Sequence, residues 1–289
     1  MTVSEAFEKF KGHLELPAYQ RQRASEAQQE LRGYIGAHLA VYDSFLTGSY
    51  ARHTKIHPLN DIDVMLVRNS ARVGLTGSGG VFPHQALDDV AEAANRAFGN
   101  GVVVKKQSRS VNLSFATLDF GFDLIPAWLR QPNGFWIPDI DTASWIQTDP
   151  QVHEEMMSES NERCQGKLKP IIKMIKHWSR NNLDLLCSFH LELICDRVFR
   201  QSSPDNYQTG VALVLVNLPS FVGIQMMDPV YGLNRVDKPL SADEFQKLSN
   251  RANYDAGNAR KAFQLECSGS HAAAIETWKH IFLTGFPNG

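Results

Sequence analysis

The residues best suited to chemistry are two acids, Asp61 and Asp63, in the run DIDVMLV at positions 61–67. The rest of the run is aliphatic, which predicts a strand, and side chains on a strand alternate between its two faces. Both carboxylates are therefore expected on one face, roughly 6.5 Å apart along the chain. Carboxylates this close repel one another unless a cation neutralises them, and oxygen ligands suit Mg²⁺. The pair predicts half of a magnesium site.

A glycine-serine turn lies shortly before these acids. The apolar run 41–46 ends there, Gly48 permits a tight turn, and Ser49 is expected to open a short helix. Backbone amides, a hydroxyl group and a helix N-terminus then face outward together, which is an arrangement that binds phosphate. A phosphate-binding turn followed by paired carboxylates predicts a site for phosphate groups bound together with metal.

A further acid is expected on a later strand. Alternating apolar residues at 111–115 predict one strand, a turn is expected at 116–119, and the run 120–127 (FGFDLIPA) predicts the returning strand. Asp123 interrupts this apolar run, and a lone acid there is costly unless it is exposed or ligated. Asp119 is the alternative, although its place in the turn has an ordinary structural explanation.

Helices are expected on both sides of these strands. Apolar spacing predicts a helix over 3–16, a second helix from Pro17 to about Leu39, and another from Pro83 to residue 98. Residues from 151 onward also have a helical pattern. In the second helix the expected buried stripe is Ala27, Leu31, Tyr34, Ile35 and Leu39.

The whole run 48–67 (GSYARHTKIHPLNDIDVMLV) resembles the DNA polymerase β-like nucleotidyltransferases. Within that superfamily it is most similar to the cGAS/DncV-like nucleotidyltransferases (SMODS type) of bacterial antiphage CBASS systems. The resemblance implies an α+β fold, in which a polymerase β-like core with a mixed sheet and helices has an N-terminal spine helix and a C-terminal helical lobe. It also implies that Asp61, Asp63 and Asp123 are the catalytic and metal-binding residues. The cofactor implied is a pair of Mg²⁺ ions, replaceable by Mn²⁺.

The resemblance continues into the second half of the chain. Residues 145–150 (WIQTDP) resemble the Trp…Asp-Pro sequence that opens the C-terminal lobe in these synthases. Residues 1–144 are therefore expected to form the catalytic core with the N-terminal helices. Residues 145–289 are expected to form the helical nucleotide-binding lobe.

A set of nucleotide-binding residues is also implied. The sequence 175–178 (IKHW) resembles a helix of oligoadenylate synthetases and their relatives, in which a lysine contacts the donor triphosphate. In the family a serine ahead of the next helix binds the triphosphate, and a neighbouring aromatic residue can stack on the base. Lysines on a helix flank are otherwise solvated, and Ser188 also fits a helix N-cap. The basic run 105–110 is a further candidate for steering triphosphates. The expected nucleotide-binding residues are Gly48, Ser49, Arg52, Lys173, Lys176, Ser188 and Phe189.

Composition narrows the class of protein. The chain of 289 residues has a formal net charge of -2, which argues against a protein that mainly coats nucleic acid. The four cysteines have no metal-ligand spacing, and the absence of a signal peptide favours a cytoplasmic location. The apolar run 211–227 contains polar residues and proline, so no membrane span is expected. No insertion resembles the zinc ribbon that the animal relative uses for DNA sensing.

The expected reaction joins nucleoside triphosphates (ATP, GTP or pyrimidine nucleotides) into a cyclic di- or oligonucleotide second messenger and releases pyrophosphate. By the same resemblance, regulatory or effector proteins of a defence operon are possible partners. An RNA 3′-end nucleotidyltransferase, CCA-adding or similar to oligoadenylate synthetase, is the alternative enzyme, and would need a basic RNA groove. An inactive nucleotide-binding sensor is the alternative of another class, although all three acids are intact.

Overall fold

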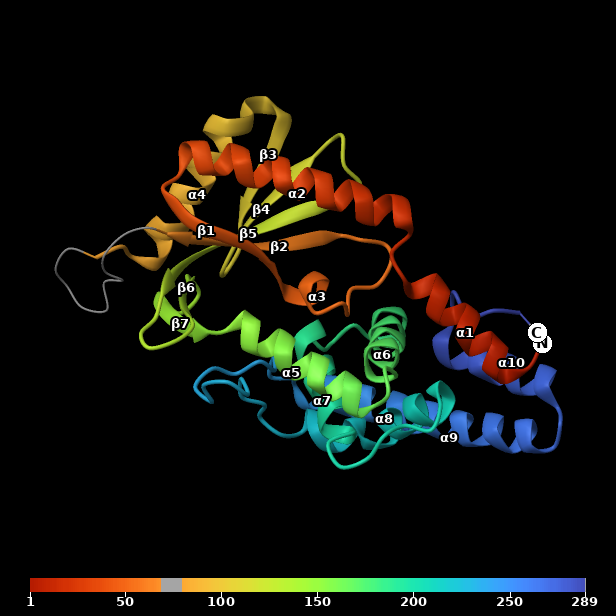
Figure 1. Cartoon of the computed structure of the whole chain (residues 1–289). Helices are drawn as coiled ribbons and strands as arrows, with labels where there is room; N and C mark the ends of the chain where they lie inside the picture. The colour runs from red at the N-terminus through yellow and green to blue at the C-terminus, as the bar shows by residue number, and fades with distance from the viewer. Residues whose placement is uncertain (69–79, 289) are drawn as a thin grey trace.

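A mixed β-sheet forms the first lobe (Figure 1). The computed structural model describes residues 1–68 and 80–288. The elements of this lobe are α2 (Ala18–His38), β1 (Val41–Thr47), α3 (Gly48–Ala51), β2 (Asp61–Arg68), α4 (Pro83–Phe98), a 3₁₀ turn η1 (Gly99–Gly101), β3 (Val102–Lys106), β4 (Val111–Phe115), β5 (Gly121–Leu129), β6 (Phe135–Asp139) and β7 (Ser144–Thr148).

The strand order brings segments from distant parts of the sequence together. Along the sheet the order is β1-β2-β5-β4-β3, while β6 pairs with β5 and with β7. β1 is antiparallel to β2, but β2 and β5 are parallel and in continuous register from Asp61↔Gly121 to Val67↔Ala127. Parallel neighbours cannot be joined by a hairpin, so the chain between β2 and β5 makes a crossover that includes α4. The central pair of strands therefore combines two segments about 60 residues apart.

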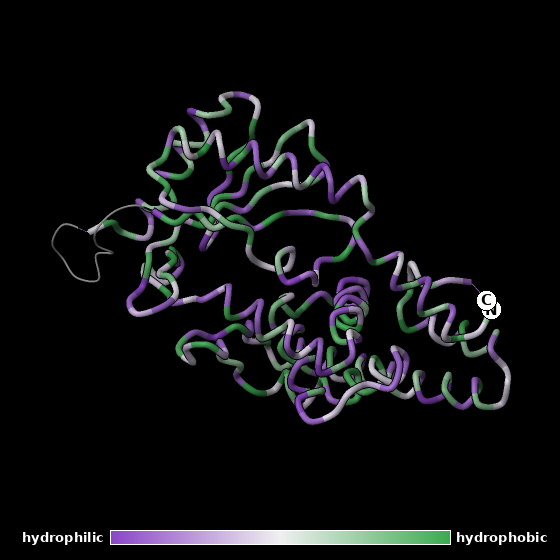
Figure 2. The backbone as a smooth tube through the Cα atoms, viewed as in Figure 1, coloured by the Kyte–Doolittle hydropathy of each residue, from purple (hydrophilic) through white to green (hydrophobic). Residues whose placement is uncertain are grey.

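The alternation along β2 separates a buried face from a functional face. Ile62, Val64 and Leu66 are buried in one core with apolar residues of α2 and α4. The strand is mostly hydrophobic along its length (Figure 2). Because successive side chains point to opposite faces, Asp61 and Asp63 lie on the face away from that core. Burial of the aliphatic face thus fixes where the two carboxylates point.

Helix α2 follows the expected boundaries but presents a rotated face to the sheet. Leu31, Ile35 and Leu39 are buried as predicted, whereas Tyr34 is 54% exposed and was wrongly assigned to the buried stripe. Its ring packs edge-on against Phe98 at the margin of the core, with 5.6 Å between the centroids. The stripe is displaced toward Ala24, which is fully buried.

The second lobe is helical and also contains the start of the chain (Figure 1). Phe7 and Phe10 share its core with Trp278 and Phe282, so the first helix packs here and not on the sheet. Consistent with this packing, the two termini lie side by side in Figure 1. The elements of this lobe are α1 (Val3–Leu14), α5 (Pro150–Arg163), α6 (Leu168–Asn182), α7 (Ser188–Val198), α8 (Tyr207–Val222), α9 (Ala242–Cys267) and α10 (His271–Phe282).

The N-terminal helices thus span both lobes. α1 belongs to the helical core, Pro17 caps the start of α2, and α2 then lies on the sheet. The expected α+β fold with an N-terminal spine and a C-terminal helical lobe is confirmed. None of the helices in the described parts of the chain has the length and apolar character needed to cross a bilayer.

We expect Phe7→Ala to destabilise the protein by about 3–5 kcal/mol, the usual cost of removing a fully buried aromatic ring. The Phe7 ring contacts Trp278 edge-on at a centroid distance of 4.9 Å and Phe286 at 5.1 Å, so its loss leaves a cavity between α1 and α10. Urea denaturation would measure the change. Phe82→Ala is the control, because Phe82 is 65% exposed and its removal should cost about 0.5 kcal/mol or less. Equal losses in the two variants would contradict this packing.

Candidate active site

The parallel pairing of β2 and β5 gathers three carboxylates. Asp63 is in direct register with Asp123, and Asp61 is two residues earlier on the same face of β2. Neighbouring strands are about 4.8 Å apart and residues in register point to the same face. Asp119, the alternative third acid, instead accepts a hydrogen bond from Gln20 at 3.1 Å in the turn before β5. The sheet therefore groups Asp123, and not Asp119, with the first two acids.

These carboxylates carry negative charge that is only partly neutralised. Burial raises the pKa of Asp63 to about 6, and repulsion from Asp61 and Asp123 adds to the effect. Burial also raises the pKa of Asp123, although a hydrogen bond from Asn112 at 2.9 Å opposes the rise. Shifts of this kind mark groups that would be stabilised by a bound cation.

The donor set fits a divalent cation by its chemistry. Carboxylate oxygens are the ligands that Mg²⁺ and Mn²⁺ prefer, and burial together with repulsion from Asp61 and Asp123 raises the pKa of Asp63. Within the described residues, however, no three acidic, histidine or cysteine side chains converge into a ready-made metal centre. Asp61 is in contact with the ammonium group of Lys55, and Asp123 is hydrogen-bonded to Asn112. Carboxylates that could hold a cation are thus present, but two of them are bound to other side chains.

The glycine-serine turn lies directly against the acids. Gly48 has a φ of +68°, and a Cβ atom at this position would be 1.9 Å from Oδ2 of Asp63. Only glycine fits both the backbone conformation and this close approach. The carbonyl oxygen of Ser49 accepts hydrogen bonds from the backbone N–H groups of Thr54 at 2.9 Å and Lys55 at 3.0 Å. The turn is therefore held in one conformation beside Asp63.

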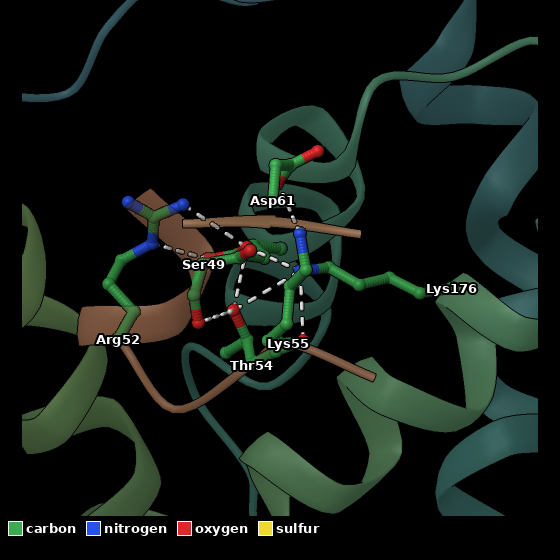
Figure 3. A network of polar contacts seen from close by, with 7 residues as sticks. Ser49, Arg52, Thr54, Lys55, Asp61 and Lys176 are labelled. Carbon is green, nitrogen blue, oxygen red and sulfur yellow. Dashed lines mark hydrogen bonds and ion pairs between the residues drawn. The ribbon is translucent and has the colours of Figure 1, made fainter. Parts of the chain in front are cut away.

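A buried cluster of charges connects this turn to the helical lobe (Figure 3). Arg52 donates to both carboxylate oxygens of Glu192 on α7, at 2.7 and 3.2 Å. Lys176 on α6 donates to the same carboxylate at 2.7 Å and to the carbonyl oxygen of Thr54 at 3.1 Å. The Thr54 hydroxyl donates to Glu192 at 2.8 Å. Three segments that are distant in the sequence thus meet at one carboxylate.

The charge state of Glu192 follows from its partners. Burial alone would raise the pKa of this carboxyl group, but the adjacent Arg52 and Lys176 outweigh burial and lower the pKa to about 2. Glu192 is completely buried, so the ionised form depends on both cations remaining in place. The cluster fastens the turn that follows Gly48 to α6 and α7.

A cleft of about 510 Å³ opens between the two lobes beside Gly48 and Arg52. The cleft brings together predicted residues from both halves of the chain, because its lining includes Gly48, Asp63, Arg52 and Phe189. The guanidinium of Arg52 lies over the Phe189 ring, with its central carbon 4.7 Å from the ring centroid. Other polar residues on the cleft wall include Arg109, Gln147, His153, Arg235 and Lys238 together with the acids Asp228 and Asp237.

Ser49 is not among the residues that line the cleft, and three further predicted nucleotide ligands also lie elsewhere. Lys176 is 2% exposed and donates to Glu192, while Lys173 is paired with Glu15 at 2.6 Å. Ser188 is exposed, and it is the first residue of α7 and not its N-cap, which is Cys187. The structure therefore does not bring these three side chains to the cleft wall.

Several residues of the site were not predicted from the sequence. Glu192 could have been found by the rule that singled out Asp123, because it is a lone acid within the apolar run LELIC at 191–195. Arg109 belongs to the basic run considered above, and in the structure it lines the cleft and pairs with Asp139 at 2.9 Å. No local signal marks Arg235 or Lys238, because only the path of the chain after α8 brings them to the cleft.

Comparison with known proteins gives consistent matches over the whole chain. A probable cyclic nucleotide synthase of Bacillus cereus (strain VD146) is 24% identical, and the match covers 99% of this chain and 98% of the relative. A cyclic AMP-AMP-AMP synthase of Acinetobacter is 27% identical over 84% of this chain and 72% of the relative. The structure of E. coli MS115-1 CdnC with ATP superimposes with a TM-score of 0.79 at 19% identity, covering 99% of each chain. The CdnC:HORMA-deltaN complex gives a TM-score of 0.78 at 20% identity, with 99% of this chain and 98% of that chain covered.

These similarities agree with the geometry of the site. The likeness to CdnC extends over both lobes, so this chain has the same fold as that protein. Residues 1–161, more than half of the chain, match the Second Messenger Oligonucleotide or Dinucleotide Synthetase (SMODS) domain. This segment contains the glycine-serine turn and all three carboxylates. The chain therefore belongs to the SMODS family of nucleotidyltransferases.

Proposed function

We propose that this protein joins nucleoside triphosphates into a cyclic di- or oligonucleotide and releases pyrophosphate. The observation that carries the proposal is the group of three carboxylates beside the Gly48 turn, of which Asp63 lines a cleft between the two lobes. The names of the relatives, which are cyclic nucleotide synthases, support the same reaction class. We further propose that the product acts as a second messenger in antiphage defence, in the cytoplasm, where the four free cysteines would remain reduced.

The residues of the cleft divide the work between phosphates, metal and base. Asp61 and Asp63 would hold two Mg²⁺ or Mn²⁺ ions, and Asp123 would bind the one beside the attacking hydroxyl. When bound, these ions lower the pKa of the ribose hydroxyl and take up charge on the leaving pyrophosphate. Ser49 and the amides after Gly48 would orient the phosphates, and Arg52 would add positive charge. Phe189 would stack on a base.

Cyclisation requires no second active site. A linear product that turns round within the cleft can present its free hydroxyl to the same site, where the hydroxyl oxygen would attack the α-phosphate of the remaining triphosphate, lose its proton and release a second pyrophosphate. We propose that residues 1–144 supply the catalytic core with the N-terminal helices and 145–289 the nucleotide-binding lobe, while α1 packs against the helical lobe and β7 pairs with the sheet. The predicted ligands Lys173, Lys176 and Ser188 would have to leave their positions in this structure to meet a nucleotide.

A protein partner is also proposed, because CdnC has been solved in complex with HORMA-deltaN.

The reaction can be tested with the four labelled nucleoside triphosphates and Mg²⁺ or Mn²⁺, followed by phosphatase, linkage-specific nuclease and mass spectrometry. We expect a phosphatase-resistant product made from nucleotides alone, without template or primer. Labelling confined to added RNA 3′ ends would assign the protein to RNA-end transferases instead. Nucleotide binding without any product would favour an inactive sensor.

Replacing the two acids of β2 together, as Asp61→Asn with Asp63→Asn, should reduce synthesis by at least about a hundredfold, since a main electrostatic stabiliser of the reaction is lost. The substitutions keep the side-chain size, so the fold should persist. Product formation and circular dichroism would be measured in parallel. Asp119→Asn is the matched control and should retain activity, because Asp119 bonds to Gln20 in a turn. A double variant with activity near wild type would refute the assignment of the acids.

The raised pKa of Asp63 also predicts a pH-dependent stability without metal. The folded protein keeps this proton up to about pH 6, whereas the unfolded chain loses it near the ordinary value of 3.8. The stability contributed by this carboxyl group is therefore present below pH 3.8 and lost as the pH rises through 6. In EDTA at pH 8, Asp63→Asn should raise Tm by at least about 2 °C. At pH 5 the gain should be smaller, and an equal gain at both pH values would contradict the assigned shift. Thermal melts between pH 5 and 8 provide the measurement.

For the buried cluster we expect Lys176→Met to lower the free energy of unfolding by about 3 kcal/mol, because it removes one of the two cations paired with Glu192. Glu192→Gln alone should cost more, because it leaves both Arg52 and Lys176 buried without a carboxylate, and adding Lys176→Met to it should recover part of that loss by removing one of the two stranded cations. Chemical denaturation of the two single variants and the double variant completes a mutant cycle. Lys169→Met on the same helix is the control and should cost far less. Additive losses would show that the two side chains do not interact.

A further inference from the structure

Lys55 is a buried cation among the three carboxylates. The side chain is 7% exposed, and its ammonium group contacts Oδ1 of Asp61, as Figure 3 shows. The Asp61 side chain itself is 37% exposed, so this carboxylate stays accessible to solvent while it contacts Lys55. Among the ion pairs of the described residues, this contact is the one that involves any of the three acids. Lys55 therefore supplies the positive charge that the acids contact directly.

The position of Lys55 is fixed from two directions. Its backbone N–H donates to the carbonyl oxygen of Ser49 at 3.0 Å, and the preceding Thr54 is held by Glu192 at 2.8 Å. The neighbouring cluster holds the two cations Arg52 and Lys176 against the single carboxylate of Glu192, so its net charge is positive. Repulsion from this cluster and attraction to the acids both direct the Lys55 ammonium toward Asp61.

We propose that Lys55 is an internal counter-ion that occupies Asp61 in the metal-free protein and must leave it before divalent cations can bind there. The inference rests on the proposed function, because it takes the three acids as the metal site. It also accounts for the finding that the three carboxylates do not converge into a metal centre, since Asp61 is engaged by Lys55. Lys55 is a positioning residue by this proposal, and it sets the cation concentration that the protein needs.

The proposal couples metal binding to nucleotide binding. A triphosphate in the cleft offers Lys55 another anion, so the ammonium can leave Asp61 without being stranded in a buried, unpaired state. Without nucleotide, a cation entering beside Asp61 meets the charge of Lys55 as well as that of the adjacent cluster. The free protein should therefore bind Mg²⁺ or Mn²⁺ weakly.

The test is a Mn²⁺ titration of the whole protein without nucleotide, followed by electron paramagnetic resonance of the free ion. We expect Lys55→Gln to bind Mn²⁺ at least about tenfold more tightly than wild type, because a like charge is removed from a partly buried site. Lys55→Arg keeps the charge and should bind Mn²⁺ within about twofold of wild type. In the Asp61→Asn background, the same Lys55→Gln change should have a smaller effect, since the side chain that Lys55 engages is neutral there.

The outcomes separate this inference from the proposed function. If Asp61→Asn with Asp63→Asn binds Mn²⁺ as wild type does, the metal site itself is wrong. If that double variant loses Mn²⁺ while Lys55→Gln binds it no more tightly than wild type, only the role of Lys55 is overturned. If Lys55→Gln is unfolded in EDTA, Mn²⁺ should restore its melting transition, and failure to restore it would also overturn the proposal.

Discussion

Electrostatic repulsion among Asp61, Asp63 and Asp123 is the constraint around which this molecule is arranged. The parallel pairing of β2 with β5 forces Asp63 and Asp123 side by side, and burial makes their charges more costly. The surrounding structure responds with cations and hydrogen-bond donors, namely Lys55 on Asp61 and Asn112 on Asp123. A hydrophobic core on the opposite face of the sheet keeps the strands paired despite this repulsion. A site of this kind favours a ligand that brings positive charge.

The second organising interaction is the buried cluster around Glu192. A fully buried carboxylate is tolerated because Arg52, Lys176 and Thr54 together satisfy it. Arg52 and Thr54 follow the glycine-serine turn of one lobe, and Lys176 lies on a helix of the other. The cluster therefore fixes this turn relative to the helical lobe. With α1 packed in the helical core and α2 on the sheet, the lobes are connected at two separate places.

The fold is shared with E. coli CdnC although the sequence identity is low. A structure of only 19% identity superimposes over 99% of each chain, which shows how few positions the fold requires in detail. The positions with strict physical demands are those where two requirements coincide. Gly48 must have a positive φ and must also leave room for Oδ2 of Asp63. Strand β2 must be apolar on one face and acidic at the start of the other.

The sequence by itself determined the local features. Alternation along 61–67 placed both acids on one face. The apolar run around Asp123 indicated that burying this acid is costly, and the glycine-serine turn predicted phosphate binding. Each of these signals acts between near neighbours in the sequence. Tertiary structure decided the rest. Three features depend on segments far apart in the chain. They are the register that sets Asp63 beside Asp123, the burial of Glu192 between Arg52 and Lys176, and the exposure of Tyr34. The orientation of a charged side chain follows the nearest opposite charge in space, and that neighbour is not written in the local sequence.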